Sequence, residues 1–272
     1  MIKNVAIAFI VFDGYVDLWD DAIKYMKKFW PDHPPIYVFT NEIIREWDDV
    51  TCIPVGVDAE WSRKAQKAIE LIKEKYIILL LEDFYVGSAI NNLAIEELIS
   101  FMDANKIKYC KLCDNNRIIH KKKKKYKKSQ YSVLYTDEDY GISLQAAVWE
   151  REFLKKTIGV GNYNAWIFEL NMVKASRGVK HKIMKFAIED TRNILNIKHG
   201  ALQGKMLPNT IKYFKKIDDP LATQREVMGK IDYYKYFMKQ LGKDIVPRPA
   251  VKTVKTIAKK FGYSFVEEKW TS

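Results

Sequence analysis

The stretch Tyr76-Ile77-Ile78-Leu79-Leu80-Leu81-Glu82-Asp83 decides the fold class of this 272-residue chain. Its first six residues form a continuous apolar run, which is typical of a β-strand covered on both faces of its sheet. The acidic pair marks the point where that strand ends. Val5–Phe12 is a second run of this kind, ended by Asp13. Two such strands predict a parallel sheet with helices on both sides.

The segments around these two strands alternate between helix and strand patterns. Apolar residues at helical spacing predict a helix over 17–30 and another that runs to Ile72, with Ser62 as its N-cap. Strands are expected at 36–39 and 51–57, which gives the order β-α-β-β-α-β and a mostly parallel, doubly wound sheet. The elements expected beyond them are a helix at 91–102, a strand at 107–113, a loop or hairpin at 120–140, a strand running into a helix at 142–154, an interrupted helical stretch at 170–213 and a helix around 233–238.

The composition, with 48% hydrophobic and 29% charged residues, is that of a globular protein. No apolar run approaches the roughly 20 residues of a membrane helix. Val5–Phe12 is the one candidate leader core, but Asp13 follows it without a small-residue cleavage site, so we interpret it as a strand and expect a cytoplasmic location. Cys110 and Cys113 form a single Cys-x-x-Cys without a second pair, which favours ordinary buried cysteines over a zinc site or a disulfide.

The net charge of +12 comes from two short segments. Seven lysines within 121–128 supply +7, and the basic residues of 243–260, less Asp244, supply +5. Residues 250–261 place apolar residues on one side of a helix and lysines mostly on the other, a pattern typical of helices that lie on an anionic membrane. The alternatives are a packed helix with a solvated lysine side and, for 121–128, a solvated loop. Charge appended in this way does not favour a nucleic-acid groove.

Glu82 and Asp83 are the first candidates for chemistry. Carboxylates at the mouth of a buried sheet can bind a divalent cation, Mn²⁺ or Mg²⁺, that neutralises a diphosphate leaving group. The alternative is a pair of solvated carboxylates at a strand end.

Two further candidates lie downstream. Glu169 closes the sequence Asn164-Ala165-Trp166-Ile167-Phe168-Glu169, and a carboxylate flanked by aromatic rings can have a raised pKa that suits a general base. The alternative is a surface glutamate in a first helical turn. Gly204-Lys205 offers a point charge for a phosphate, although the glycine-rich pattern of a P-loop does not precede it. The alternative is a helix-ending glycine beside a solvent-exposed lysine.

Taken together and in order, these features resemble the GT-A glycosyltransferases of bacterial cell-surface polysaccharide synthesis, of the capsular or O-antigen type. The resemblance covers residues 1–215. It is carried by Phe12-Asp13-Gly14-Tyr15, Asp17-Leu18-Trp19, Phe29-Trp30-Pro31, Trp61-Ser62, Leu81-Glu82-Asp83-Phe84, Ser143-Leu144-Gln145-Ala146-Ala147 with Trp149, Asn164 to Glu169, and Gly204-Lys205.

The resemblance implies an inverting enzyme that takes its sugar from a nucleotide-sugar donor, with Glu169 as the catalytic base. The Asp-x-Asp of many GT-A enzymes is replaced here by Glu82-Asp83-Phe84, so one metal-facing carboxylate, Asp83, is assigned. The remaining roles that it implies are nucleotide binding by Asp13 and Trp61, contact with the donor diphosphate or its metal by Glu82 and Asp83, charge balance on the diphosphate by Lys205, and a donor–acceptor cleft lined by Ser143, Gln145 and Trp166.

The expected organisation is a GT-A domain at 1–215 followed by a helical, basic extension at 216–272. Within the domain, 1–115 is the nucleotide-sugar half and 116–215 the acceptor half. A saccharide or lipid-linked saccharide acceptor would place the protein peripherally at the inner face of the membrane. Two other classes stay open: a nucleic-acid-binding protein, favoured by Tyr126 and Tyr131 beside the lysines, and a non-catalytic interaction protein on the same fold.

Overall fold

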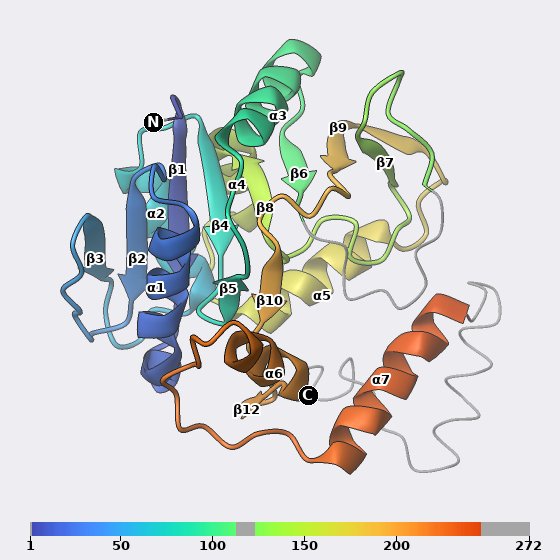
Figure 1. Ribbon diagram of the computed structural model, residues 1–272. Coiled ribbons are helices and arrows are strands. Elements are labelled where there is room, and N and C mark those ends of the chain that lie inside the picture. Colours follow the sequence, from blue (N-terminus) through green and yellow to red (C-terminus); the bar gives the residue numbers. More distant parts are fainter. Residues whose placement is uncertain (1, 113–122, 246–272) are drawn as a thin grey trace. The chain divides into compact units, whose positions relative to one another are not determined.

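The computed structural model describes residues 2–112 and 123–245, with side chains up to Met238, and the chain divides into two compact units (Figure 1). Residues 2–112 and 123–227 belong to the first unit. The second contains the helix α7 (Lys230–Ile245). Cys113, Lys121, Lys122 and the amphipathic segment 250–261 lie outside the described residues.

The described strands of the first unit include an eight-stranded sheet in the order β3-β2-β1-β4-β8-β6-β9-β7. β1 pairs in parallel with β2 and β4, β2 with β3, and β6 with β9, whereas β8 and β7 are antiparallel to their neighbours. The predicted mostly parallel, Rossmann-like sheet is therefore confirmed. Its strands are β1 (Val5–Ile10), β2 (Ile36–Thr40), β3 (Val50–Pro54), β4 (Tyr76–Leu80), β6 (Tyr109–Lys111), β7 (Ser132–Tyr135), β8 (Ala147–Glu150) and β9 (Ile183–Glu189).

Helices cover both faces of this sheet, so every side chain of its central strands β1 and β4 is buried (Figure 1). Along β1, Val5, Ile7 and Phe9 point into the core under α1, α3 and α6, while the small Ala6 and Ala8 face the core under α2, α4 and α5. The helices are η1 (Asp13–Leu18, a 3₁₀ helix), α1 (Trp19–Phe29), α2 (Trp61–Leu71), α3 (Asn92–Asn105), α4 (Arg151–Ile158), α5 (Ala165–Ser176) and α6 (Pro208–Lys216).

The stretch 170–213, expected to be helical with breaks, is helical only at its two ends, in α5 and at the start of α6, so the prediction was wrong for the residues between them. Beyond α5 and β9 come β10 (Ile197–His199), which pairs with β5 (Phe84–Val86), and the hairpin of β11 (Ala201–Leu202) and β12 (Lys205–Met206). In β9 the apolar residues Met184 and Phe186 lie on either side of Lys185 at the spacing of a strand, and pairing with β6 and β7 fixes that conformation.

Ser62 is not the N-cap that its sequence position indicates. α2 begins at Trp61, and the Ser62 hydroxyl donates to the Gly161 carbonyl at 2.9 Å and accepts from the Tyr163 amide at 2.7 Å. Both partners precede α5, so the hydroxyl joins α2 to the chain that leads into α5.

Residues 217–227 run back along α1 and η1 within the first unit. Asp219 forms ion pairs with Lys24 and Lys28, and the Asp21 carboxylate accepts from the Ala222 amide at 2.8 Å. The boundary expected after residue 215 falls at the end of α6, whereas the first unit continues to Val227.

None of the helices in the described ranges combines the length and apolar character that a membrane crossing requires.

Candidate functional site

The candidate site lies where the carboxyl ends of β1 and β4 meet, at the edge of the sheet where ligands bind in open α/β folds. Asp13 follows β1, and Glu82 and Asp83 follow β4. β8 is antiparallel to β4, with Ala147 opposite Leu79, so the residues just before β8 lie at the same edge. The topology therefore gathers segments far apart in the sequence at one edge.

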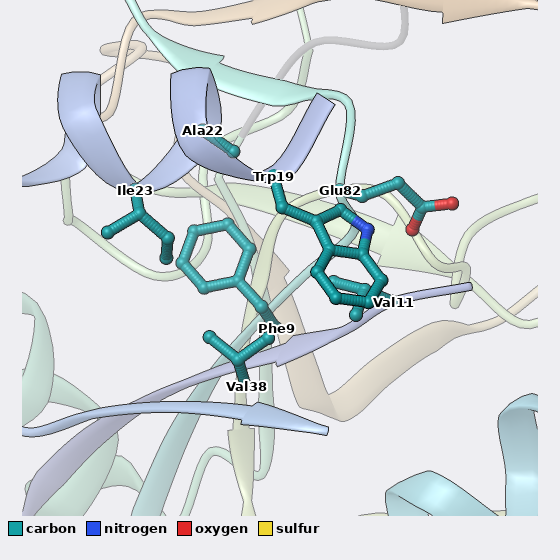
Figure 2. A pocket seen from close by; sticks show the side chains of 7 residues that line it. All are labelled: Phe9, Val11, Trp19, Ala22, Ile23, Val38 and Glu82. Carbon is teal, nitrogen blue, oxygen red and sulfur yellow. The ribbon is translucent and has the colours of Figure 1, made fainter. Parts of the chain in front are cut away.

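The Glu82 side chain packs on its inner side against an apolar floor (Figure 2). Phe9, Val11 and Trp19 are among the residues that line a small void beside it, which has no room for a water molecule. This burial, together with the charge of Asp83, raises the pKa of Glu82 to about 8, although Lys64 and Arg225 act in the opposite direction. Glu82 therefore holds its proton more tightly than an ordinary glutamate, although its side chain is only partly buried.

Asp83 is fixed by the end of β10. Its Oδ2 accepts from the Ala201 amide at 3.2 Å, and its carbonyl accepts from the Gly200 amide at 2.6 Å. Burial raises the pKa of Asp83 to about 6, and the Ala201 amide limits that rise. A Cβ at Gly200 would lie 2.6 Å from the Tyr85 ring, so glycine is the residue that allows this close approach.

Lys64 is a buried cation near Glu82. The Nζ atom donates to the Val11 carbonyl at 2.6 Å and to Asn41 Oδ1 at 2.8 Å. Burial lowers the pKa of Lys64, and the charges of Glu82 and Asp13 oppose that effect. Our sequence reasoning missed Lys64, although a signal exists: it lies on the same side of α2 as Trp61 and Ala68, where an apolar residue is expected.

Arg225 is the second cation that the sequence reasoning missed. Its guanidinium pairs with Asp17, donates to the carbonyls of Gly14 at 3.1 Å and Gly204 at 3.4 Å, and stacks 4.3 Å from the centre of the Tyr15 ring. The Asp17 carboxylate raises the pKa of Arg225, and the positive charge in turn lowers the pKa of Glu82. No sequence pattern marks Arg225, because tertiary folding alone brings it to η1.

Phe12 and Tyr15 form an aromatic surface at the same edge. Phe12 is 54% exposed, and the two ring centres lie 6.0 Å apart. The Phe12 ring lies over Gly14, where a Cβ would be 2.5 Å from it. An exposed ring of this kind offers a face on which a planar group can stack.

Asp13 and Trp61, both expected to hold a nucleotide, make contacts within the protein. The Asp13 carboxylate accepts from the amides of Asn41, Glu42 and Ile43 at 2.8–2.9 Å and so anchors the loop after β2. The Trp61 side chain is buried, with its ring centre 4.9 Å from that of Phe168 on α5. These contacts position the loop after β2, whose Asn41 binds Lys64, and the helix α2, which carries Lys64.

Glu169 is held at the same edge of the sheet by the segment before β8. Its Oε1 accepts from the Leu144 amide at 2.6 Å. Ser143 is buried and its amide donates to the Tyr109 hydroxyl at 3.3 Å, whereas Gln145 is half-buried. Trp166, in the first turn of α5, is 48% exposed. The structure thus brings Glu169, Ser143 and Gln145 together.

Lys205 lies on the β11–β12 hairpin, whose two turn residues, Gln203 and Gly204, both have positive φ angles, as tight hairpin turns require. The Lys205 Nζ donates to Glu226 Oε1 at 2.7 Å in an exposed ion pair. Because Arg225 also donates to the Gly204 carbonyl, this hairpin lies next to η1.

A groove of about 490 Å³ begins one helical turn beyond Glu169 and lies between α5 and β9. Its apolar part includes Ile142, Met172 and Phe186, and Lys180 and Lys182 also line it. A groove of this size and character can hold a ligand, and neither Glu82 nor Asp83 lines it.

Within the described residues, no three or more histidine, cysteine, aspartate or glutamate side chains are grouped in a way that could hold a metal ion. Glu82 and Asp83 supply two adjacent carboxylates with raised pKa values. Mg²⁺ is commonly held by one or two carboxylates together with substrate phosphates. The pair therefore fits a divalent cation that arrives with a diphosphate.

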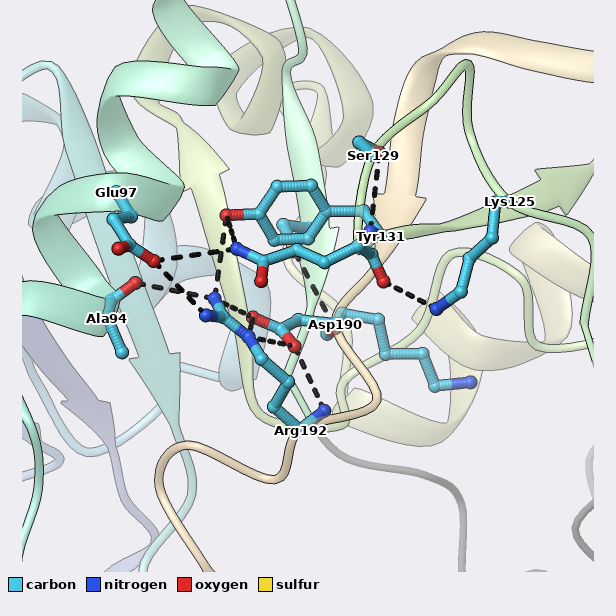
Figure 3. Close-up of polar contacts among 10 residues, drawn as sticks. Ala94, Glu97, Lys125, Ser129, Tyr131, Asp190 and Arg192 are labelled. Atoms are coloured by element: carbon cyan, nitrogen blue, oxygen red, sulfur yellow. Dashed lines mark hydrogen bonds and ion pairs between the residues drawn. The ribbon is translucent and has the colours of Figure 1, made fainter.

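A second Glu-Asp pair, Glu189 and Asp190, lies at the end of β9, and Figure 3 shows the contacts of Asp190. Glu189 is fully buried and forms an ion pair with Lys123. Asp190 accepts from Arg192 at 2.7 Å (Nη2) and 3.0 Å (Nε), and Arg192 also lies 3.4 Å from Glu97. Each carboxylate of this pair is therefore neutralised by a basic side chain.

No protein-family model matches the chain, and no curated protein sequence matches it. Among solved structures, it is similar to a TarS fragment, residues 1–349, from S. aureus, with 10% identity over 69% of this chain and 60% of that one and a TM-score of 0.43. A cytidylyltransferase from Leptospira borgpetersenii is 11% identical over 96% of both chains, with a TM-score of 0.40. The bifunctional IspDF from Campylobacter jejuni is 13% identical over 70% of this chain and 50% of that one, with a TM-score of 0.37. At such low similarity, the functional proposal rests on this chain's own residues.

Proposed function

We propose that the chain is an inverting glycosyltransferase of the GT-A type that transfers a sugar from a nucleotide-sugar donor to a saccharide or lipid-linked saccharide. The observation that carries this proposal is the Glu82–Asp83 pair, partly buried and with raised pKa values, at the carboxyl edge of a parallel sheet, with Lys64 and Arg225 nearby. Carboxylates whose charge is disfavoured in the free protein are stabilised by a bound divalent cation, and that cation in turn attracts a diphosphate.

The donor half of the site is formed by the ends of β1 and β4. Phe12 and Tyr15 offer the nucleobase an aromatic face, while Asp83 and Glu82 would hold a Mn²⁺ or Mg²⁺ ion against the diphosphate. When bound, that cation would stabilise the negative charge on the leaving phosphates. Lys205 is on the hairpin next to η1, where its ammonium group could supply further positive charge.

The acceptor half is formed by α5 and the segment before β8. Glu169 takes the proton from the acceptor hydroxyl, whose oxygen bonds to the anomeric carbon of the donor sugar. The bond from that carbon to the diphosphate oxygen breaks, and its electron pair leaves with the nucleoside diphosphate. A single displacement of this kind inverts the anomeric configuration. The Leu144 amide orients the base, and the groove between α5 and β9 would take the rest of the acceptor.

A role in capsular or lipopolysaccharide synthesis would place the acceptor on a lipid carrier and the protein at the inner face of the membrane. The lysines of 123–128 support this placement less than their number suggests. Besides the Lys123–Glu189 pair, Lys125 donates to the Gln130 carbonyl at 2.6 Å and Lys127 to Asn105 Oδ1 at 2.6 Å.

Nucleotide binding and base catalysis are tested separately. We expect uridine, cytidine, guanosine or adenosine diphosphate, with Mn²⁺, to raise the melting temperature of the whole chain, and the response across this panel to identify the base. We expect Glu169→Gln to keep that shift and to lower sugar transfer at least about 1000-fold, because the base is lost.

Glu46→Gln, at an exposed position after β2, is the matched control and should leave both properties unchanged. Near wild-type transfer by Glu169→Gln would exclude Glu169 as the base. Salt-dependent binding to RNA or DNA without any nucleotide response would favour the nucleic-acid alternative.

A further inference from the structure

The described part of α7 exposes its apolar side chains. Ile231 is 73% exposed, Tyr234 63% and Met238 44%, and the spacing of three and then four residues puts them on one side of the helix. Phe237, 40% exposed, widens this apolar side, and the sequence continues the same spacing with Leu241 and Ile245. A helix in water does not leave such a side uncovered without a partner.

The charges of α7 follow a different line. Lys235, Lys239 and Lys243 recur every four residues, and their line runs from the edge of the apolar side at Lys235 to the side opposite Tyr234 at Lys243. Lys230 adds a fourth positive charge, while Asp232 and Asp244 are the acidic residues of the helix. The helix is therefore amphipathic, aromatic on one side and net basic on the other.

We propose that α7 lies in the plane of an anionic lipid surface, with Ile231, Tyr234, Phe237 and Met238 inserted among the lipids. Charge complementarity selects this partner: Lys230 and Lys235 lie beside the apolar side of the helix, where their ammonium groups can reach anionic headgroups while the apolar side chains insert. This inference rests on the proposed function. Binding of α7 to the membrane would keep the enzyme close to its lipid-linked acceptors.

A second copy of the chain fits this surface less well. The heptad spacing of Ile231, Tyr234 and Met238 extends over about two heptads in a helix of 16 residues, whereas a stable coiled coil needs three or four. Phe237 also makes the apolar side broader than a coiled-coil seam. Nucleic acid would place bases on aromatic rings among the lysines, but here Lys239 and Lys243 lie away from the exposed ring of Tyr234.

Tyr234 and Tyr236 provide a matched pair of positions for the test. They are two residues apart on α7, and Tyr234 is on the apolar side while Tyr236 points to the opposite side. Co-sedimentation of the full chain with vesicles of 70% phosphatidylcholine and 30% phosphatidylglycerol measures the partition coefficient of each variant.

We expect Tyr234→Gln to lower this coefficient about tenfold, because an inserted aromatic ring is lost, and Tyr236→Gln to change it less than about twofold. Pure phosphatidylcholine vesicles should bind the wild-type chain at least about tenfold more weakly, because the lysines lose their anionic partners. Equal effects of the two substitutions, or no binding of the wild-type chain to anionic vesicles, would overturn the proposal. So would a dimer in vesicle-free solution that Tyr234→Gln dissociates while vesicle binding is unchanged.

The nucleoside diphosphate thermal shift, measured without vesicles, separates this inference from the proposed function. A chain that shows the Tyr234 and Tyr236 contrast but no nucleotide response binds membranes without being this transferase. A chain with the nucleotide response but without the contrast keeps its proposed activity and loses the α7 assignment. Circular dichroism of both variants confirms that each is folded.

Discussion

The dipeptide Glu-Asp occurs at the carboxyl ends of two strands, β4 and β9, that each have a parallel neighbour. The two copies differ in whether basic side chains neutralise their carboxylates. Glu189 and Asp190 are buried and face Lys123 and Arg192 directly. Within the described part of the chain, neither Glu82 nor Asp83 forms an ion pair, and the pKa of each is raised. A neutralised pair becomes costly to the fold when one partner is removed, whereas a pair kept short of counter-charge is available to a ligand.

The strongest test of this difference makes the same substitution, aspartate to asparagine, in both pairs. We expect Asp83→Asn to lower sugar transfer at least about 100-fold, because the carboxylate that faces the donor loses its charge. Its melting temperature should stay within a few degrees of the wild type, because the free protein disfavours that charge. Steady-state kinetics with a nucleotide-sugar donor, alongside thermal unfolding, gives both values. Unchanged transfer would remove Asp83 from the donor site.

Asp190→Asn should have the opposite profile. The substitution removes the charged partner of the Arg192 guanidinium, which donates to both carboxylate oxygens. Loss of one member of a largely buried pair destabilises a protein by about 2–4 kcal/mol. The free energy of unfolding in urea measures this, and transfer per folded molecule should be unaffected. A stability equal to wild type would show that the second pair is not structural.

The glutamates of the two pairs can be compared by the effect of Glu82→Gln and Glu189→Gln on stability at different pH values. Because the pKa of folded Glu82, about 8, lies above its ordinary value of 4.5, ionisation of this residue destabilises the folded state as the pH rises from 4.5 through 8. The substitution should therefore stabilise the protein by about 1–3 kcal/mol at pH 9 and by almost nothing at pH 4.5. Glu189→Gln, which deprives Lys123 of its partner, should instead destabilise it at pH 7. Urea unfolding across this pH range distinguishes a desolvated Glu82 from a solvated one, for which the two curves would coincide.

The central part of the fold was predictable because β1 and β4 are covered on both faces and so appear as uninterrupted apolar runs. Their ends also located Glu82 and Asp83. The strands between 183 and 206 were not predictable, since short strands with lysines take their conformation from their pairing partners. For the same reason the sequence did not reveal that Glu189 and Asp190 stand at the end of a strand.

The cations of the site were hidden in two different ways. Lys64 did have a signal in the sequence, because a lysine on the apolar side of a helix is unexpected. Arg225 had no local signal, since the sequence division placed it in the C-terminal extension and only folding brings it to Asp17. The roles of Glu169, Asp83 and Lys205 stay predictions, although the structure brings Glu169 to the same sheet edge as Asp83.

Arg225 also has a consequence for how the protein is made. One guanidinium contacts Gly14 and Asp17 near the start of the chain and Gly204 near the end of the first unit. While the chain is on the ribosome, the strands around β1 and β4 can pair long before residue 225 emerges. The candidate site would then lack one of its cations until the last residues of the unit are translated. A stalled or shortened nascent chain would be folded at its centre and incomplete at this site.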